Sequence, residues 1–265
     1  MELEVLGNCG GSPGPGGACS GYLVQDGSTC LLLDCGPGIV ASLQRSHHVS
    51  DVSAIYISHM HADHCLDLWT LAFRLSSTWR RDGIDLAEQR PIPLFVPSGG
   101  ADMLHDWEKV LIPSRLAQTF EVHERSPREQ IRVAGMTLSC FPTEHGVLCQ
   151  GVRVASESGQ LAYSGDTRLF ADLPELAEGT DLFLCEASGR SPDEFAIVTG
   201  MHLTARQAAT IAQTAGTAKL LLTHLVVHNE QYRQSLQTDA AEHFDGPVEV
   251  AELGRSYAVD TRSIL

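Results

Sequence analysis

The sequence predicts an α/β protein in which two β-sheets lie face to face with helices on their outer sides. Strand-like apolar segments and helix patterns alternate along the 265 residues, and the pattern divides into two similar halves near residue 130. Hydrophobic residues make up 43% of the chain, enough for a sizeable core. No short repeat, low-complexity segment or long linker separates the halves. We therefore expect residues 1–265 to form a single domain.

The first half opens with a meander of short strands punctuated by glycine. A further apolar strand ends at Ile57, and a helix pattern with apolar residues three or four positions apart follows it. In this half the expected strands are residues 3–6, 21–24, 30–34, 52–57, 91–96 and 119–122, and the expected helices are residues 65–80 and 101–111.

The second half repeats the alternation of strands and helices. Its clearest helix has Thr204 as N-cap with Gln207 three residues later, a capping box, and Gly216 ends it. Here the expected strands are residues 136–141, 151–155, 160–163, 181–185 and 219–222, and the expected helix is residues 204–216.

The charge balance bears on the class of substrate. Acidic residues outnumber Lys and Arg by 33 to 18, which gives a formal net charge of −15. A protein that grips structured RNA needs basic residues to displace condensed counterions. Arg80, Arg81 and residues 125–132 are locally basic, but the overall balance favours a small substrate over structured RNA.

The termini and cysteines indicate the compartment. No apolar run reaches the ~18 residues of a transmembrane helix, so no membrane span or membrane partner is expected. The acidic residues 1–5 read as a strand rather than a secretory signal, which favours a cytoplasmic location. The eight cysteines form no CxxC pair and are expected to be reduced and mostly buried. Cys65 adjoins the main motif, but no ligand role is needed for it.

The most specific feature of the sequence is the segment His59-Met60-His61-Ala62-Asp63-His64. Its four potential ligands lie where a strand ends and a helix begins, so the turn can aim them in pairs at adjacent points. Histidines also cluster by chance on solvated loops, but such a dense polar loop directly after an apolar strand favours metal binding. Imidazole and carboxylate together suit zinc, manganese, iron or cobalt.

Through this HxHxDH signature the chain resembles the metallo-β-lactamase superfamily, and later motifs continue the resemblance over nearly its whole length. Phe141-Pro142-Thr143-Glu144-His145, Tyr163-Ser164-Gly165-Asp166-Thr167 and Leu221-Leu222-Thr223-His224 follow in the family's order. The resemblance implies a four-layer αββα sandwich with two similar halves. It also implies two divalent metal ions, zinc as first choice and manganese as the alternative. One ion would take His59, His61 and His145, the other Asp63, His64 and His224, with Asp166 shared.

Two further motifs resemble those of ribonuclease Z and related phosphodiesterases. Gly200-Met201-His202-Leu203-Thr204-Ala205 is similar to a histidine-before-helix motif, and Asp181-Leu182-Phe183-Leu184-Cys185-Glu186-Ala187 is similar to its glutamate partner. A histidine held by a carboxylate can stay protonated near neutral pH and protonate a leaving alkoxide. His202 could also be an ordinary helix-start histidine. The catalytic residues implied are Asp63, which is also a ligand, His202 and Glu186.

Two positions carry open alternatives. Asp34 resembles the family carboxylate that orients a metal-bound histidine, and it could equally be a turn residue before Gly36-Pro37. The glycine-rich segment 7–17 could present backbone N–H groups to a substrate phosphate, or it could be a flexible turn.

The expected function is a binuclear metal-dependent hydrolase, a phosphodiesterase acting on small phosphodiesters such as cyclic nucleotides. The expected mechanism is attack of a metal-bridging hydroxide on phosphorus while His202 assists departure. Ribonuclease Z proteins that mature transfer RNA usually carry an RNA-gripping arm between the third histidine and the bridging aspartate. Here only residues 146–165 lie between His145 and Asp166. A homodimer is expected by resemblance.

Three other functions compete with this reading. The alternative is a ribonuclease Z-like RNA 3′-end endonuclease. A lactonase or thioesterase of the same fold is a third reading, against which the pairing of His202 with Glu186 counts. A catalytically silent scaffold is a fourth, but all seven ligand positions are filled.

Overall fold

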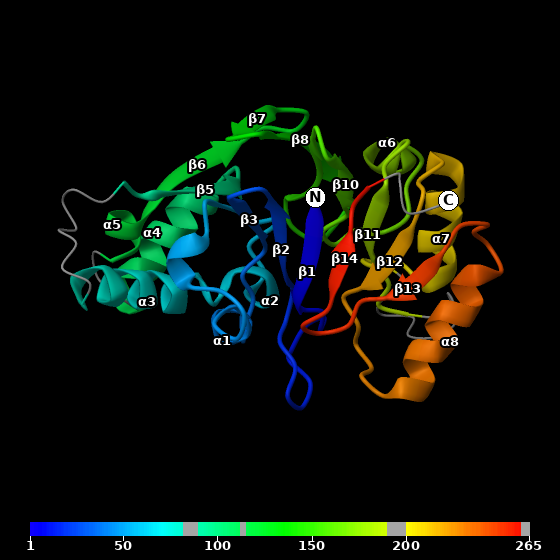
Figure 1. Ribbon diagram of the computed structural model, residues 1–265, viewed down its shortest axis with the longest axis horizontal. Coiled ribbons are helices and arrows are strands. Elements are labelled where there is room, and N and C mark those ends of the chain that lie inside the picture. Colours follow the sequence, from blue (N-terminus) through cyan, green and yellow to red (C-terminus); the bar gives the residue numbers. More distant parts are fainter. Residues whose placement is uncertain (82–89, 112–114, 190–199, 261–265) are drawn as a thin grey trace.

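Two seven-stranded β-sheets form the centre of the protein, and helices cover the outer face of each (Figure 1). The computed structural model describes residues 1–81, 90–111, 115–189 and 200–260. In the first sheet the strands are, in spatial order, β14 (Ser256–Ala258), β1 (Glu2–Gly7), β2 (Gly21–Asp26), β3 (Thr29–Leu33), β4 (Ala54–Tyr56), β5 (Ile92–Pro97) and β6 (Phe120–Arg125). In the second they are β13 (Val248–Val250), β12 (Leu220–Thr223), β11 (Leu182–Glu186), β10 (Gly159–Tyr163), β9 (Cys149–Ser156), β8 (Met136–Thr143) and β7 (Gln130–Val133).

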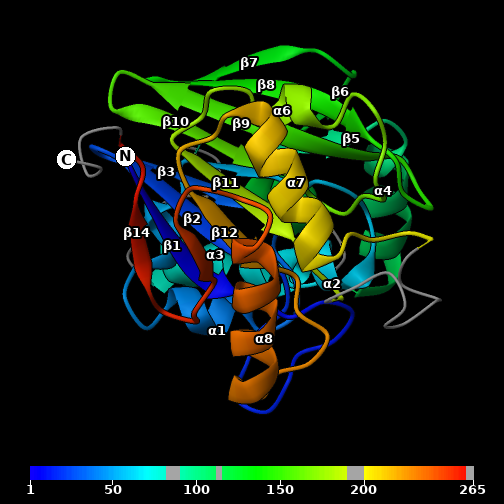
Figure 2. The same cartoon turned by 90° about the vertical axis from the view of Figure 1, so that its right-hand side faces the viewer.

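The helices divide between the two outer faces, as Figure 1 and Figure 2 show. Those of the first half share a buried apolar cluster with the first sheet, and those of the second half share another with the second sheet. The first group comprises α1 (Ile39–Leu43), a 3-10 helix (Val49–Asp51), α2 (Ala62–Cys65), α3 (Leu68–Arg81), α4 (Gly100–Leu111) and α5 (Leu116–Thr119); the second comprises α6 (Pro174–Ala177), α7 (Ala205–Ala215) and α8 (Glu230–Ala241).

The central strands are buried on both faces, which explains their continuous apolar sequences. In β3, Leu31 and Leu33 lie in the core between the sheets, whereas Leu32 lies in the cluster under the helices. In β11, Leu184 faces the inter-sheet core and Phe183 faces the helices. Because side chains alternate between the faces of a strand, only an all-apolar strand fits both environments.

Each sheet combines antiparallel strands with a run of parallel ones. Strands β3 to β6 are parallel to one another, and so are β10 to β13. Functional loops of α/β sheets lie beyond the carboxyl ends of such strands. The loops that follow β3, β4, β10 and β12 carry Asp34, the segment 58–64, Asp166 and His224.

The predicted fold class is confirmed, including the division near residue 130, because β6 ends at Arg125 and β7 begins at Gln130. Strand β14 is the exception, since it returns to pair with β1 in the first sheet. The helix expected at residues 65–80 is confirmed as α3, but it begins at Leu68, and Cys65 ends the separate short helix α2. Between the two helices the Asp67 N–H bonds to the Cys35 carbonyl instead of a carbonyl of α2. All eight cysteines are free and buried, as expected.

Several elements had no sequence prediction: β7, β13, β14, α8, the short helices α1, α2, α5 and α6, and the 3-10 helix. Strands β13 and β14 have three residues each, and the polar α8 has only Leu236 and Ala240 buried, so each gives a weak pattern. Within the described part of the chain, no helix combines the length and apolarity that crossing a membrane requires.

Candidate metal centre

The HxHxDH segment lies in the turn between β4 and α2. His59 and His64 are fully buried, and His61 and Asp63 are partly exposed. Asp63 and His64 belong to α2, His61 precedes it in extended backbone, and His59 lies two residues earlier. The turn therefore directs all four side chains toward the second sheet, where Asp166 and His224 are also buried.

Three loops of the second half bring the remaining predicted ligands to the same place. His145 follows β8, Asp166 follows β10, and His224 follows β12. His224 has a φ of 57°, a left-handed conformation uncommon for a residue with a Cβ. Residues held in this way concentrate at functional sites.

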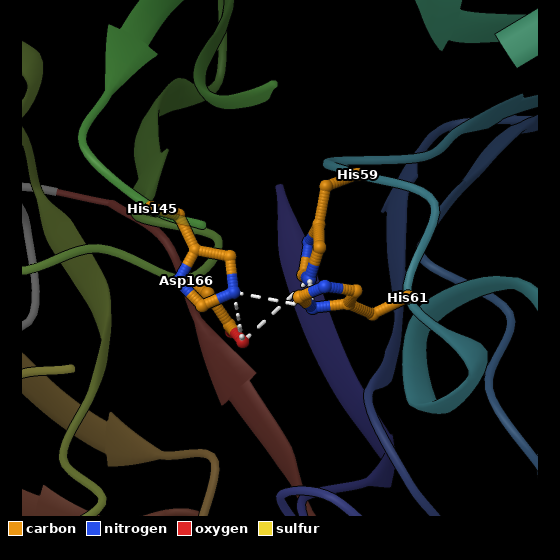
Figure 3. Close-up of side chains that lie close together, drawn as sticks. All are labelled: His59, His61, His145 and Asp166. Atoms are coloured by element: carbon orange, nitrogen blue, oxygen red, sulfur yellow. Dashed lines mark hydrogen bonds and ion pairs between the residues drawn. The ribbon is translucent and has the colours of Figure 1, made fainter. Parts of the chain in front are cut away.

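One ligand set contains His59, His61, His145 and Asp166, which face one another in Figure 3. The distance from His61 Nδ1 is 2.9 Å to His59 Nε2 and 3.2 Å to His145 Nε2. Asp166 Oδ2 lies 3.7 Å from His59 Nε2 and 3.8 Å from His145 Nε2. A zinc tetrahedron with bonds of ~2.0–2.1 Å has edges of about 3.3–3.4 Å, so these four atoms are spaced to surround one ion.

The second set contains Asp63, His64 and His224. Asp63 Oδ2 lies 3.4 Å from His64 Nε2 and 3.3 Å from His224 Nε2. Asp166 also reaches this set, because its Oδ1 lies 3.3 Å from His64 Nε2 and its Oδ2 lies 3.3 Å from His224 Nε2. Asp166 is thus positioned between the two sets, where a bridging ligand would lie.

Two atoms of these sets, which lie 3.3 Å from each other, are buried and make no hydrogen bond to any described residue: His64 Nε2 and Asp166 Oδ1. Buried polar atoms are almost always paired, because an unpaired one costs about 1–3 kcal/mol. Both atoms point into the space shared by the ligand sets, so the donor chemistry fits divalent metal ions.

The protonation states of three of these residues suit metal binding as well. Burial favours the neutral form of Asp63 and Asp166, but the surrounding histidines hold the pKa of both carboxyls below the usual range. Burial, aided by the neighbouring His64, places the pKa of His59 well below its usual value. Ionised carboxylates and a neutral imidazole are the forms that bind a cation.

Four of the five ligand histidines are held through the ring nitrogen that does not face the centre. His145 Nδ1 lies 3.0 Å from the Met201 carbonyl, and His224 Nδ1 lies 2.9 Å from Ser188 Oγ. His59 Nδ1 lies 3.1 Å from Ser58 Oγ. For His64 the partner is Asp34 Oδ2, at 2.7 Å. Such contacts set the tautomer and direct the other nitrogen toward a metal.

Asp34 is the centre of a buried hydrogen-bond network. Its Oδ1 accepts from the Ser58 N–H at 2.6 Å, and its Oδ2 accepts from Ser58 Oγ at 2.8 Å and Tyr163 OH at 2.6 Å. Together with the contact to His64, these bonds resolve the open alternative. Asp34 has a left-handed φ of 58° but serves as more than a turn residue, because it orients a ring of the second set.

His202 and Glu186 form a pair beside both sets. His202 Nδ1 lies 3.1 Å from each Glu186 oxygen, and its ring stacks on His224 with centroids 5.1 Å apart. Glu186 is fully buried and also accepts from the N–H groups of Thr167 and Leu203. Burial opposes a charge on His202, but the Glu186 carboxylate outweighs it and raises the pKa of His202 to about 9.

The glycine-rich segment 7–17 packs against the second set. A Cβ on Gly10 would lie 2.7 Å from the His224 ring, so only glycine fits there. The Gly11 N–H donates to Asp63 Oδ2 at 2.7 Å, so this N–H holds a candidate ligand in place.

Cys65 is buried and its thiol donates to the His61 carbonyl, and burial raises the pKa of Cys65 to about 12. Cys65 belongs to none of the potential ligand groups found among the described residues.

Arg125 belongs to the locally basic segment 125–132, yet it lies in the interior of the protein. It is 1% exposed, and its guanidinium stacks 3.8 Å from the Tyr56 ring centroid. Its Nη2 donates to the Ile57 carbonyl at 2.5 Å, directly before the HxHxDH turn. Arg125 therefore stabilises the backbone of the turn, as Ser58 and Ser188 stabilise the rings of His59 and His224. None of these three residues lies in a motif that would have revealed its role.

Comparison with known proteins adds the family context. A family model described as a β-lactamase superfamily domain matches residues 29–225. Rv1339, an uncharacterized protein of Mycobacterium tuberculosis, is 33% identical over 270 residues, which cover 98% of this chain and 92% of that protein. A ribonuclease Z of Myxococcus xanthus is 27% identical over 301 residues and covers 95% of each chain.

A solved structure with the same architecture is that of the metallo-β-lactamase fold protein YhfI from Bacillus subtilis. The two structures superpose with a TM-score of 0.83 at 24% sequence identity, over 97% of this chain and 98% of that chain. The shared fold therefore extends over nearly the whole chain.

Proposed function

Because this chain belongs to the β-lactamase superfamily, we propose that its metal centre hydrolyses small phosphodiesters, with cyclic nucleotides as the first natural candidates. The chain is a metallo-hydrolase of the metallo-β-lactamase fold, with a His/Asp cluster able to hold metal ions. The proposal concerns the substrate, the catalytic residues and the metal.

The pair of His202 and Glu186 is the observation that supports phosphodiester chemistry. Glu186 engages Nδ1 of His202, which leaves Nε2 as the ring nitrogen available to a substrate. The His202 side chain is 20% exposed, so a bound phosphodiester can reach this nitrogen. A protonated imidazole in this place stabilises charge on phosphoryl oxygens and donates its proton to the departing alkoxide. Hydrolysis of a lactone has less need of a protonated imidazole in addition to the metal ions.

We assign the metal ligands as the sequence predicts: His59, His61 and His145 in one set, Asp63, His64 and His224 in the other, and Asp166 between them. Two divalent ions held there would supply Lewis acidity toward phosphoryl oxygens and a nucleophile at neutral pH. The first set offers three imidazoles, a donor group typical of catalytic zinc, and we propose zinc with manganese as the alternative.

A small substrate is favoured over structured RNA for two reasons. Residues 146–165, all described, contain β9 and β10 joined by Glu157 and Ser158, and this tight hairpin leaves no inserted arm between His145 and Asp166. The formal charge of −15 also opposes a polyanionic partner. The alternative function is RNA 3′-end cleavage, which the 27% identity to a ribonuclease Z favours.

Hydrolysis of bis(p-nitrophenyl) phosphate tests the proposal. Purified protein loaded with zinc or manganese should release p-nitrophenolate, and chelator-treated protein should not. A fully metallated sample without turnover would reject phosphodiester chemistry and favour lactones or thioesters. Precursor transfer RNA under the same conditions separates the two phosphodiester functions: specific cleavage at its 3′ end would replace our proposal with the alternative.

A further inference from the structure

A hollow of about 500 Å³ opens directly beside the metal centre. Its volume falls within the ~300–1,000 Å³ typical of small-ligand sites. The lining includes Glu144, His145, Val147, Leu148, Arg168 and Met201. His145 belongs both to this wall and to the first ligand set, so the hollow, which we call the His145 hollow, adjoins the centre.

The walls of the His145 hollow are held together by hydrogen bonds among three separate segments. The Arg168 N–H donates to the Glu144 carbonyl at 2.8 Å, and the Glu144 N–H donates to Thr167 Oγ1 at 3.2 Å. His145 Nδ1 contacts the Met201 carbonyl at 3.0 Å. These bonds tie the loop after β8 to the loop after β10 and to the segment before α7. The hollow is therefore preformed.

Three of the exposed side chains that line the hollow are large and apolar. Val147 is 42% exposed, Leu148 66% and Met201 37%, and these are three of the nine large hydrophobic side chains that are exposed in the described part of the chain. Exposed apolar groups gathered at one place mark a binding surface. At the rim, Arg168 and Glu144 form an ion pair of 2.7 Å, which supplies both hydrogen-bond donors and acceptors.

We propose that the His145 hollow binds a flat ring system, an aromatic group or a heterocyclic base, attached to the phosphate of the substrate. A phosphate at the metal centre projects its substituent past His145, and the hollow is the adjoining space. A heterocyclic ring has apolar faces, which fit Val147, Leu148 and Met201, and a polar edge, which fits Arg168 and Glu144. This inference rests on the proposed phosphodiesterase function and names the residues that select its substrates.

Leu148→Ser tests the inference by equilibrium binding, which does not require turnover. Calorimetry on metal-loaded protein compares thymidine 5′-monophosphate, which carries a base, with methyl phosphate, which does not. In the wild type the nucleotide should bind more tightly. Leu148→Ser should weaken nucleotide binding roughly tenfold and leave methyl phosphate binding within about twofold, because the lost contact is to the ring alone.

Leu111→Ser is the matched control, since Leu111 is 50% exposed on α4 and lies outside the hollow. It should change neither affinity. In turnover, Leu148→Ser should raise KM for bis(p-nitrophenyl) phosphate with little change in kcat. Equal wild-type affinity for the two phosphates, or equal weakening of both by Leu148→Ser, would overturn the inference. Failure of phosphodiester turnover alone would refute only the proposed function, because the binding comparison stands without it.

Discussion

Asp34→Asn is the substitution that tests most directly how the second ligand set is built. Asn has nearly the shape of Asp and tolerates the left-handed φ of 58° at this position. Its Oδ1 can still accept from the Ser58 N–H. Its amide, however, would face His64 Nδ1, which lies 2.7 Å from Oδ2 in the wild type. For His64 Nε2 to bind a metal, Nδ1 must carry the ring proton. The Nδ1–H of His64 and the side-chain NH2 of the new Asn, both donors, would then face each other.

The expected magnitude follows from the loss of this orienting contact. Partners of metal-bound histidines typically contribute 10–100-fold to metal affinity, which is about 1.4–2.7 kcal/mol. Asp34→Asn should weaken the site of Asp63, His64 and His224 by that factor, and the set containing His59, His61 and His145 should keep its affinity.

Competition of the protein with a chromophoric chelator, followed by elemental analysis after dialysis, measures the two sites separately. Asp67→Asn is the matched control. Asp67 Oδ2 accepts the Gly38 and Val40 N–H groups at 3.0 Å, so this variant removes the charge from a part-buried carboxylate and leaves the candidate ligands unchanged. Thermal unfolding of both apo variants separates general stability from the metal effect. Two metal equivalents bound to Asp34→Asn with wild-type affinity would refute the reasoning.

Four further predictions concern the centre and the assembly. His202→Ala should lower kcat by roughly 10²–10⁴-fold at unchanged metal content; loss of metal instead would make His202 a ligand, which its proximity to Asp166 and His224 permits. Asp166→Ala should empty at least one site, and full occupancy by elemental analysis would contradict its bridging place. Gly10→Ala should displace the His224 ring and reduce metal occupancy, because the new Cβ would lie 2.7 Å from it; unchanged occupancy would show that the loop yields. A homodimer should appear in light scattering at twice 28.6 kDa, and a single-chain mass would reject it.

Sequence reasoning was strongest where a pattern has a local cause. The capping box of Thr204 and Gln207 and the stop at Gly216 occur as predicted, because both depend on residues within one turn. The seven predicted ligands converge in space, since their motifs directly follow strands whose order the resemblance supplies.

The supports of the centre depend on long-range contacts and were harder to foresee. Tyr163 and Asp34 meet across 129 positions of sequence, and Ser188 and His224 across 36. Arg125 is the last residue of β6, a strand of mixed polar and apolar residues, and its charge alone gives no sign of burial. Only the three-dimensional placement of Tyr56 and the Ile57 carbonyl reveals that it is buried.

The centre draws on both halves of the sandwich, and this has a thermodynamic consequence. Residues before the division near 130 supply four candidate ligands, and residues after it supply three, so ions bound there would join two layers that also meet through their apolar core and through hydrogen bonds such as that from Tyr163 to Asp34. Linkage is reciprocal. Ions that bind only when the two sheets are packed together stabilise that packing, and any change that loosens the packing lowers the affinity for the ions. A large-to-small substitution far from the centre, in the core between the sheets, would then lower the metal affinity before it unfolded the protein.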